Sequence, residues 1–394
     1  MTDISASALA GSQERARVRA LHSLKLMGTA PEERFDRITR IARELFDVPD
    51  ALVNFLDENE QFTKSGSLPG PKTIKRSDSF CDVTISSPEL LVVEDATADP
   101  RFADKPDTTG GRGIRFYAGR PLSVDGGHRV GTLCIYDTKP RQLSREDRRK
   151  LDELGAWAEG ELRDSMDLDR AHAVQQALLP ATSPGAPSFE IAGLCLPARR
   201  VGGDFYTWTA TDGILDLTLA DVMGKGTAAA LMAATIRAAI HSVGAREPAG
   251  AFEQVARDLE HDLDVTGIFA TAFRARLDLQ TGQLLYADAG HGLTLVVAPD
   301  GSHRQLRGKG LPLGLGGPGS WQTSTTTVDR GDVLVSFTDG VLDLYGGTLQ
   351  ALDDVAELVI RHPAPSALAD AFRALAPSGE QDDDITIVSL RRLA

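Results

Sequence analysis

Four aspartates of this chain each stand within three residues of a glycine or beside further aspartates, next to a short run of β-forming residues. They occupy the segments VGGDFY (201–206), DVMGKG (221–226), SFTDG (336–340) and QDDDIT (381–386). Oxygen ligands are those that Mg2+ and Mn2+ prefer, and an adjacent glycine lets the backbone turn toward an ion. A single Asp-Gly pair is more often an ordinary turn. Four such segments together predict a divalent-cation site, because clustered carboxylates without a cation would repel one another.

Several other residues could have a catalytic role, but each could also have a purely structural one. His291, in the segment AGHG, could act as a general acid, or could hydrogen-bond a neighbouring loop at a tight strand-ending turn. Lys225 could orient a phosphate or could be a solvated loop lysine. The cysteines Cys81, Cys134 and Cys195 form no CxxC pair, so we expect them to be reduced and buried rather than bridged.

A sheet-rich C-terminal half is predicted to position the aspartates. Strands are expected at 189–197, 214–221, 271–278, 282–289, 293–298, 332–338 and 384–390. Helices are expected at 227–243, 249–264, 352–361 and 366–376. Helices and strands in these proportions predict an α/β sandwich of two β-sheets flanked by helices.

The N-terminal part has a different pattern and is predicted to be a separate α+β domain. After a flexible stretch (1–19), helical periodicity covers 13–27 and 32–45, and strand-like runs follow at 51–56, 90–93, 115–121 and 130–136. This domain is expected to span 20–143. It would be followed by a helical linker (144–179) and by the C-terminal domain (180–394), with a boundary loop at 180–187.

The linker is nearly free of glycine and proline, which favours one long helix. A heptad frame that starts at Leu151 and Leu154 places polar residues on its seam, so a regular coiled coil is not expected. The helix is either a packed connection between domains or a signalling helix that forms a dimer.

Bulk composition narrows the function further. The 394 residues include 42% hydrophobic and 25% charged residues, which is typical of a globular protein with two domains. A net charge of −14 argues against nonspecific nucleic-acid binding. No apolar run is long enough for a spanning helix and the start has no signal-peptide pattern, so we expect a cytoplasmic protein without a membrane segment.

The ordered set VGGDFY, DVMGKG, AGHG, TDG and DDDIT resembles the SpoIIE/RsbU branch of the PPM (protein phosphatase 2C-like) phosphatases, over about 170–394. The resemblance implies a metal-dependent serine/threonine protein phosphatase with two Mn2+ or Mg2+ ions, in which a metal-bound hydroxide attacks phosphorus directly. It assigns Asp221 as the bridging ligand, helped by the carbonyl of Val222. Asp204 would serve the second ion, and Asp339 and Asp383 the first, although any of Asp382, Asp383 and Asp384 could be the ligand in the last segment.

The segments SFCD (79–82), IRFYAGRPL (114–122) and GTLCI (131–135), with others between 20 and 160, resemble a GAF domain. These motifs determine a scaffold and do not identify a ligand, so the GAF ligand is unknown. A GAF cysteine can anchor a chromophore, but Cys81 is expected to be a buried small side chain, and no chromophore is predicted.

The family resemblance also implies partners. The expected substrate is a phosphorylated anti-sigma-factor antagonist of the STAS type in a partner-switching pathway, and the expected assembly is a homodimer. The alternative function is a catalytically weak pseudophosphatase that binds the phosphoprotein as a signalling scaffold. The retained aspartates favour the enzyme.

Overall fold

The chain folds into two compact units in a computed structural model that describes residues 3–66, 72–180, 187–244, 246–348, 350–376 and 381–393. Unit 1 ends at Leu168 and unit 2 begins at Asp169. Helix α5 (Arg145–Leu178) contains residues of both units. Among the described residues, no helix is long and apolar enough to cross a lipid bilayer. The boundary loop expected at 180–187 lies almost wholly outside the described residues.

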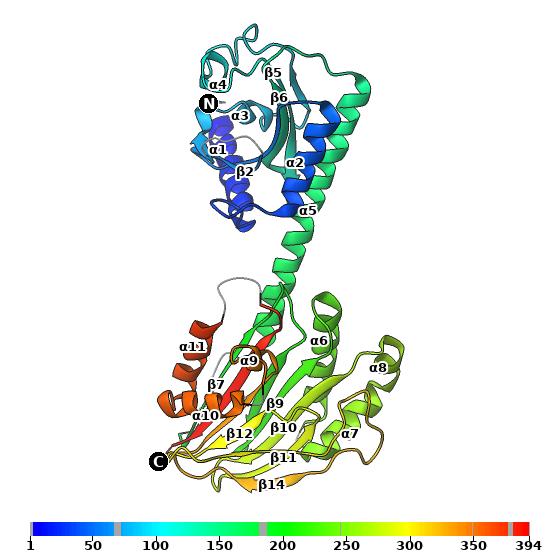
Figure 1. Ribbon diagram of the computed structural model, residues 1–394, viewed down its shortest axis with the longest axis vertical. Helices are drawn as coiled ribbons and strands as arrows, with labels where there is room; N and C mark the ends of the chain where they lie inside the picture. The colour runs from blue at the N-terminus through cyan, green and yellow to red at the C-terminus, as the bar shows by residue number, and fades with distance from the viewer. Residues whose placement is uncertain are drawn as a thin grey trace. The chain divides into compact units, whose positions relative to one another are not determined.

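Unit 1 is built on an antiparallel sheet with the strand order β3-β2-β1-β6-β5-β4 (Figure 1). Its strands are β1 (Asp50–Leu56), β2 (Glu60–Ser65), β3 (Thr73–Lys75), β4 (Leu91–Val93), β5 (Phe116–Val124) and β6 (His128–Asp137). Its helices besides α5 are α1 (Asp3–Ser23), α2 (Glu33–Phe46), α3 (Cys81–Thr84) and α4 (Pro106–Thr109), with 3-10 turns η1 (Arg76–Asp78) and η2 (Asp125–Gly127). This is the α+β arrangement that the sequence predicts.

The two faces of this sheet have separate cores, because successive side chains of a strand point to opposite faces. On β6, Leu133 and Ile135 pack with α2 and α5, whereas Cys134 and Tyr136 pack with α3 and the segment around Phe102. Helix α1 starts ten residues before the helix that we expected at 13–27 and ends earlier. Part of the stretch expected to be flexible is therefore helical, and Val18 and Leu21 are buried.

The apolar face of α5 is used inside unit 1. Leu151, Leu154, Ala158 and Leu162 are buried in the same core as α2 and β1. The residues on which a dimer seam was considered are therefore part of the unit 1 core. The large apolar residues of the helix that are exposed, Val174 and Leu178, lie near its C-terminal end.

Unit 2 is a sandwich of two antiparallel sheets (Figure 1). The first has the order β14-β11-β10-β9-β8 and contains β8 (Phe205–Thr211), β9 (Ile214–Val222), β10 (Ala270–Asp278), β11 (Gln283–Ala289) and β14 (Ser324–Thr327). The second has the order β13-β12-β15-β16-β7 and contains β7 (Phe189–Leu196), β12 (Thr294–Val297), β13 (His303–Gln305), β15 (Val333–Phe337) and β16 (Ile385–Arg392).

Helices cover the outer faces of both sheets. The first sheet is covered by α6 (Thr227–Ser242), α7 (Pro248–Asp258) and α8 (Glu260–Thr266), and the second by α9 (Gly340–Asp343), α10 (Ala351–Arg361) and α11 (Pro365–Leu375). The predicted α/β sandwich is confirmed. The single helix expected at 249–264 is two helices, because Leu259 leaves helical geometry between them.

Candidate metal centre

The four sequence-predicted aspartates lie at one edge of the unit 2 sandwich. Asp204 immediately precedes β8 and Asp221 is near the end of β9, and these antiparallel strands pair Phe205 with Ala220. In the other sheet, Asp339 follows β15 and Asp383 precedes β16, and these strands are also antiparallel neighbours. Each sheet therefore contributes one pair of carboxylates to the edge.

A threonine joins the two pairs. Thr338, the residue before Asp339, donates its hydroxyl proton to the Asp204 carboxylate with an Oγ1–Oδ2 distance of 2.7 Å. Asp204 is 1% exposed. Burial raises the pKa of Asp204 well above its usual value, and the nearby charges of Asp221 and Asp384 raise it further.

Asp221 lies among the other carboxylates. Burial raises the pKa of Asp221 to about 7, and the charges of Asp339 and Asp383 act in the same direction. A hydrogen bond with the Asp204 carboxyl opposes this shift. The site therefore holds more negative charge than its surroundings compensate, and its carboxyls compete for protons.

Asp339 and Asp383 are the outer members of the group. Partial desolvation raises the pKa of Asp339, and the charge of Asp383 adds to this effect. Asp383 forms an ion pair with Lys225, with 3.1 Å between Nζ and Oδ2. The same ammonium group also donates to the carbonyl of Asp382. Lys225 thus supplies one positive charge at the edge of the site, on the loop between β9 and α6.

The next aspartate in the chain, Asp384, holds the backbone. Its carboxylate accepts the N–H groups of Ala198 and Gly203, each at 2.7 Å, and that of Asp204 at 3.4 Å. A Cβ on Gly202 would lie 2.3 Å from Asp384 Oδ2, so this close approach requires glycine. Asp384 therefore fixes the turn that presents Asp204, and its oxygens are already engaged.

The donor set suits a hard divalent cation in its chemistry, since it consists of carboxylates and the carbonyl of Val222 at the end of β9. The raised pKa values of Asp204, Asp221 and Asp339 indicate charge that a cation would neutralise. The carboxylate groups do not converge on a single position where one ion could contact three of them. Within the described ranges, no group of three or more His, Cys, Asp or Glu side chains is arranged so that it could hold a metal ion.

His291 lies at the same edge but is turned inward. The carboxylate of Asp288 accepts the N–H groups of His291 (2.9 Å) and Gly292 (2.7 Å), and His291 Nε2 is 3.1 Å from Ser336 Oγ. Burial lowers the pKa of His291 to about 4, because the imidazolium would lose its hydration. Gly292 has φ +66°, which favours glycine. This geometry favours the tight-turn interpretation of AGHG.

Sequence reasoning missed Thr338 and Gln175. Gln175 of α5 clamps the backbone of Gly202, because its Nε2 donates to the Gly202 carbonyl at 2.7 Å and its Oε1 accepts the Gly202 N–H at 3.1 Å. The helix is thus attached to the turn before Asp204. A polar residue at the end of an otherwise buried strand was the available signal for Thr338, whereas nothing in the pattern pairs residue 175 with residue 202.

Comparison with known proteins agrees with both predicted domains. Residues 30–162 match the GAF domain family, and residues 211–393 match the family described as Stage II sporulation protein E (SpoIIE). Asp221, Asp339 and Asp383 lie inside the second match, and Asp204 lies before it. The predicted order of a GAF domain followed by a SpoIIE-type PPM phosphatase domain is confirmed.

Individual proteins are similar to one part or the other. The chain is 29% identical over 237 residues to the phosphoserine phosphatase RsbU of Bacillus subtilis, which covers 57% of the chain and 70% of RsbU. It is 37% identical over 128 residues to a cyclic di-GMP phosphodiesterase of Pseudomonas aeruginosa, covering 32% of the chain but only 22% of that enzyme. The solved SiaA-PP2C domain of Pseudomonas aeruginosa is 27% identical, with a TM-score of 0.49 over 57% of the chain and 95% of that domain.

Proposed function

Because the chain carries a GAF domain followed by a SpoIIE-type phosphatase domain, we propose that it is a metal-dependent protein serine/threonine phosphatase that its GAF domain regulates. The observation that supports this most directly is the convergence of Asp204, Asp221, Asp339 and Asp383 at one edge of the sandwich, where burial and mutual repulsion raise the pKa values of three of them. Such a group of carboxylates is stable in its ionised form only beside cations.

The proposed ligands are those assigned by resemblance, and the geometry supports a choice between Asp383 and Asp384. Asp221 would hold both Mn2+ or Mg2+ ions, and the carbonyl of Val222 would be an added ligand. Asp204 would bind the second ion, and Asp339 and Asp383 the first. Asp383 is preferred over Asp384, because the Asp384 carboxylate is occupied by backbone N–H groups. Bound cations would activate water and stabilise the charge that develops on the phosphoryl oxygens.

The chain's own residues prepare this chemistry. Thr338 and Asp384 orient Asp204 through a side-chain and a backbone hydrogen bond, respectively. Lys225 neutralises Asp383 until a cation replaces it, and would then be free to contact a phosphate oxygen. Cys195 is not a suitable nucleophile, since burial raises its pKa.

The proposed substrate is a phosphorylated anti-sigma-factor antagonist of the STAS type. The support is the similarity to RsbU, whose name describes a phosphoserine phosphatase. The test is phosphate release from such a phosphoprotein by the purified full-length chain in Mn2+. Asp221→Asn and Asp339→Asn are expected to abolish release. Asp212→Asn is the matched control, because Asp212 is exposed at the opposite end of β8 and β9, and Asn tolerates its φ of +52°.

The alternative function, a pseudophosphatase scaffold, gives a different result in the same experiment. If the chain is a scaffold, the wild-type protein binds the phosphoprotein, but no condition with Mn2+ or Mg2+ gives phosphate release. Undiminished turnover of Asp221→Asn would contradict the proposed site, whereas turnover that Asp221→Asn abolishes and Asp212→Asn leaves unchanged would exclude the scaffold.

Regulation is proposed to act through α5. Gln175 holds the backbone of Gly202, two residues before Asp204, so a change in the position of the helix end would move a candidate ligand. Gln175→Ala removes both hydrogen bonds and is expected to change the basal rate and the Mn2+ concentration at half-maximal rate. Gln176→Ala, which removes a 3.4 Å contact to the Cys195 carbonyl, is the control on the same helix.

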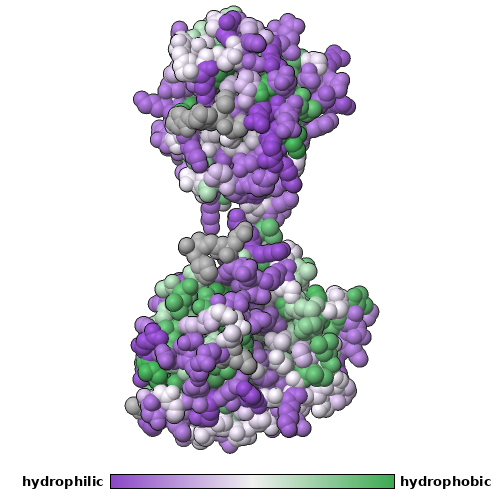
Figure 2. Space-filling model, viewed as in Figure 1, coloured by the Kyte–Doolittle hydropathy of each residue, from purple (hydrophilic) through white to green (hydrophobic). Residues whose placement is uncertain are grey.

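The homodimer is also a proposal, and its interface cannot use Leu151 and Leu154 of α5. Leu151 and Leu154 are buried in the core of unit 1, so their substitution would unfold that unit rather than report on association. Val174 of α5 and Leu231 of α6 are 60% and 67% exposed, and Figure 2 shows apolar surface on the part of unit 2 where α6 lies. Val174→Asp with Leu231→Asp is therefore the sharper test, with light scattering as the measurement.

A further inference from the structure

Two thiols that are far apart in the sequence meet inside unit 1. Cys81 begins α3 and Cys134 lies in β6, and their Sγ atoms are 4.0 Å apart. Both cysteines are free, and they are 3% and 1% exposed. No sequence pattern associates these two cysteines, because their contact depends on the packing of α3 against the face of β6 that also carries Tyr136.

Hydrogen-bond donors converge on this pair, although the surrounding cluster is mostly apolar. Asn54 Nδ2 is 3.4 Å from each sulfur, and the Tyr117 hydroxyl donates to Cys81 Sγ at 3.5 Å. The Thr63 hydroxyl donates to the side-chain amide oxygen Oδ1 of Asn54 at 2.8 Å, which fixes the orientation of that amide. A thiol that only fills space needs no such donors, whereas a thiolate is stabilised by them.

We propose that Cys81 and Cys134 form an oxidisable dithiol, which a peroxide converts into an intramolecular disulfide inside the GAF domain. A disulfide has an S–S length of about 2.05 Å, so the two sulfurs must approach by roughly 2 Å. Cys81 lies at the start of a short helix, whereas Cys134 lies in the middle of the sheet between β1 and β5. The movement is therefore expected at Cys81.

The two cysteines have different roles in this reaction. Burial raises the pKa of Cys81, but the hydrogen bonds from Cys134 and Tyr117 oppose this effect, and the result is a pKa of about 6. The pKa of Cys134 is raised well above its usual value, through its hydrogen bond with Cys81 and through burial. Cys81 is accordingly the thiolate that reacts first, and Cys134 is the thiol that resolves.

The chemistry balances in two steps. The Cys81 thiolate attacks one peroxide oxygen, the O–O bond breaks, and a sulfenic acid forms while the other oxygen leaves as an alcohol or water after taking up a proton. The Cys134 sulfur then attacks Cys81 Sγ, the S–O bond breaks, and water leaves with the thiol proton. The two thiols together lose two electrons and two protons, and the peroxide is reduced.

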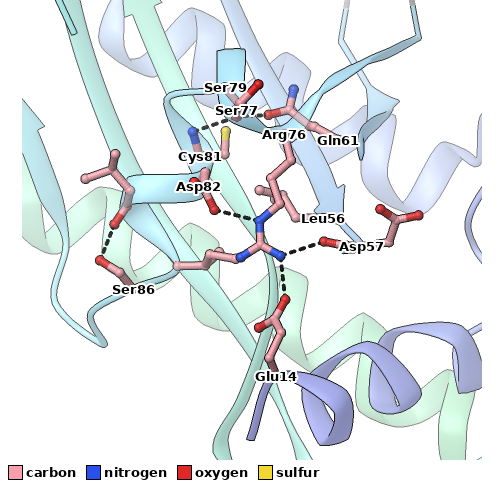
Figure 3. A network of polar contacts seen from close by, with 12 residues as sticks. Glu14, Leu56, Asp57, Gln61, Arg76, Ser77, Ser79, Cys81, Asp82 and Ser86 are labelled. Atoms are coloured by element: carbon pink, nitrogen blue, oxygen red, sulfur yellow. Dashed lines mark hydrogen bonds and ion pairs between the residues drawn. The ribbon is translucent and has the colours of Figure 1, made fainter. Parts of the chain in front are cut away.

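Oxidation would act on a neighbouring ion-pair network. Asp82, the next residue after Cys81, accepts a hydrogen bond from Arg76 Nε at 2.6 Å, and Arg76 also pairs with Glu14 of α1 (Figure 3). Glu14 in turn pairs with Arg17 at 2.7 Å, and Arg17 donates to the carbonyl of Leu56 at 2.6 Å. A shift of Cys81 toward Cys134 would pull on the contacts that hold α1 against the sheet.

The test is exposure of the full-length wild-type chain to hydrogen peroxide, followed by alkylation in denaturant and mass spectrometry. The expected product lacks two hydrogen atoms, joins the peptides of Cys81 and Cys134, and is reversed by dithiothreitol. Cys195 is the internal control: burial raises the pKa of its thiol, and it should react about tenfold more slowly or not at all. A bulky maleimide should react more slowly than peroxide with both buried thiols, because access to them is restricted.

Variants separate the proposed roles. Cys134→Ser keeps a hydroxyl donor beside Cys81 but cannot form a disulfide, so it should stop at a sulfenic acid on Cys81 that dimedone traps, and Cys81→Ala should leave Cys134 unreacted at the same dose. Tyr117→Phe keeps the ring among Phe80 and Phe102 but removes the donor, and should slow the first step about fivefold, the equivalent of one ordinary hydrogen bond. Hydrogen exchange at residues 11–23 should rise in the oxidised protein.

Several outcomes would overturn the proposal. Wild-type protein that keeps its full mass after a peroxide dose that oxidises free glutathione would contradict it, and this measurement needs no variant to fold. A disulfide that involves Cys195, or a Cys134→Ser protein whose Cys81 does not react, would also contradict it. The readouts are masses and exchange rates, so they are independent of phosphatase activity and of the proposed metal site.

Discussion

Replacing Asp221 by asparagine removes one negative charge from the candidate metal centre while keeping the shape of the side chain. In the metal-free fold, the pKa of Asp221 is raised from 3.8 to about 7, by burial and by the charges of Asp339 and Asp383. Three pKa units at roughly 1.4 kcal/mol each correspond to about 4 kcal/mol for ionising this carboxyl in the folded state. Metal-free Asp221→Asn is therefore expected to be more stable than metal-free wild type.

The pH dependence gives this expectation its sign. Between pH 3.8 and about 7, the folded protein keeps a proton on Asp221 that the unfolded chain has lost. The free energy of unfolding of the wild type should therefore fall as the pH rises through this window, and the loss should be complete above pH 7. The variant has no such loss, so the difference between the two proteins should be small at pH 4 and largest at pH 8.

The assay is thermal unfolding of chelator-treated protein at both pH values, before and after addition of Mn2+. For a unit of this size, the pH 8 difference in Tm has a ceiling of roughly 10 °C, since the neighbouring carboxyls share the effect. Mn2+ should then stabilise the wild type and Asp212→Asn strongly, and Asp221→Asn much less. Equal stability of metal-free wild type and Asp221→Asn at pH 8, or a difference that is the same at pH 4, would refute the reasoning.

Three further outcomes follow from the same geometry. Burial lowers the pKa of His291 from 6.5 to about 4, so the free energy of unfolding should fall by about 3 kcal/mol as the pH falls through this window. His291→Gln should lose less stability on acidification, and it should keep most of the turnover because the residue supports the turn. Turnover should vanish in chelator and return with Mn2+ or Mg2+ but poorly with Zn2+, because the proposed ligands are oxygens, and turnover that survives exhaustive chelation would contradict this. Lys225→Met removes the ion pair with Asp383 and should lower the Kd for Mn2+, measured by calorimetry, by up to about fivefold, which is the range of an exposed ion pair. An unchanged Kd would show that the ion pair does not compete with the cation.

Much of the candidate site could be predicted because its residues are placed by strand ends. In an antiparallel pair, the start of one strand is opposite the end of the other, so an aspartate before β8 and another at the end of β9 must be neighbours. The same holds for Asp339 and Asp383 around β15 and β16. The expected strands include β9, β15 and β16, which is sufficient to predict that Asp339 and Asp383 meet. No strand was expected at 205–211, so the meeting of Asp204 and Asp221 depends on β8, which the structure adds.

The remaining features depend on contacts that the local pattern does not contain. Asp382, Asp383 and Asp384 are identical in type, and only the position of the turn at Gly203 determines that Asp384 binds the backbone while Asp383 faces Lys225. The apolar period of α5 likewise identifies a face to be covered, but not whether unit 1 or a second chain covers Leu151. Periodicity specifies what must be buried, and the partner is decided by tertiary packing.

The glycines beside the aspartates turn out to matter for a reason other than the one the sequence suggested. A Cβ on Gly340 would lie 2.1 Å from the Asp384 carbonyl, and one on Gly203 would lie 2.5 Å from the Val222 carbonyl. These glycines let two backbone segments touch, so that the hydrogen bonds of Asp384 and the clamp of Gln175 act on the same turn. The position of Asp204 is therefore set jointly by α5 and by the segment before β16. A movement of the helix would act on a carboxylate whose ionised form is already destabilised by burial and by the charges of Asp221 and Asp384.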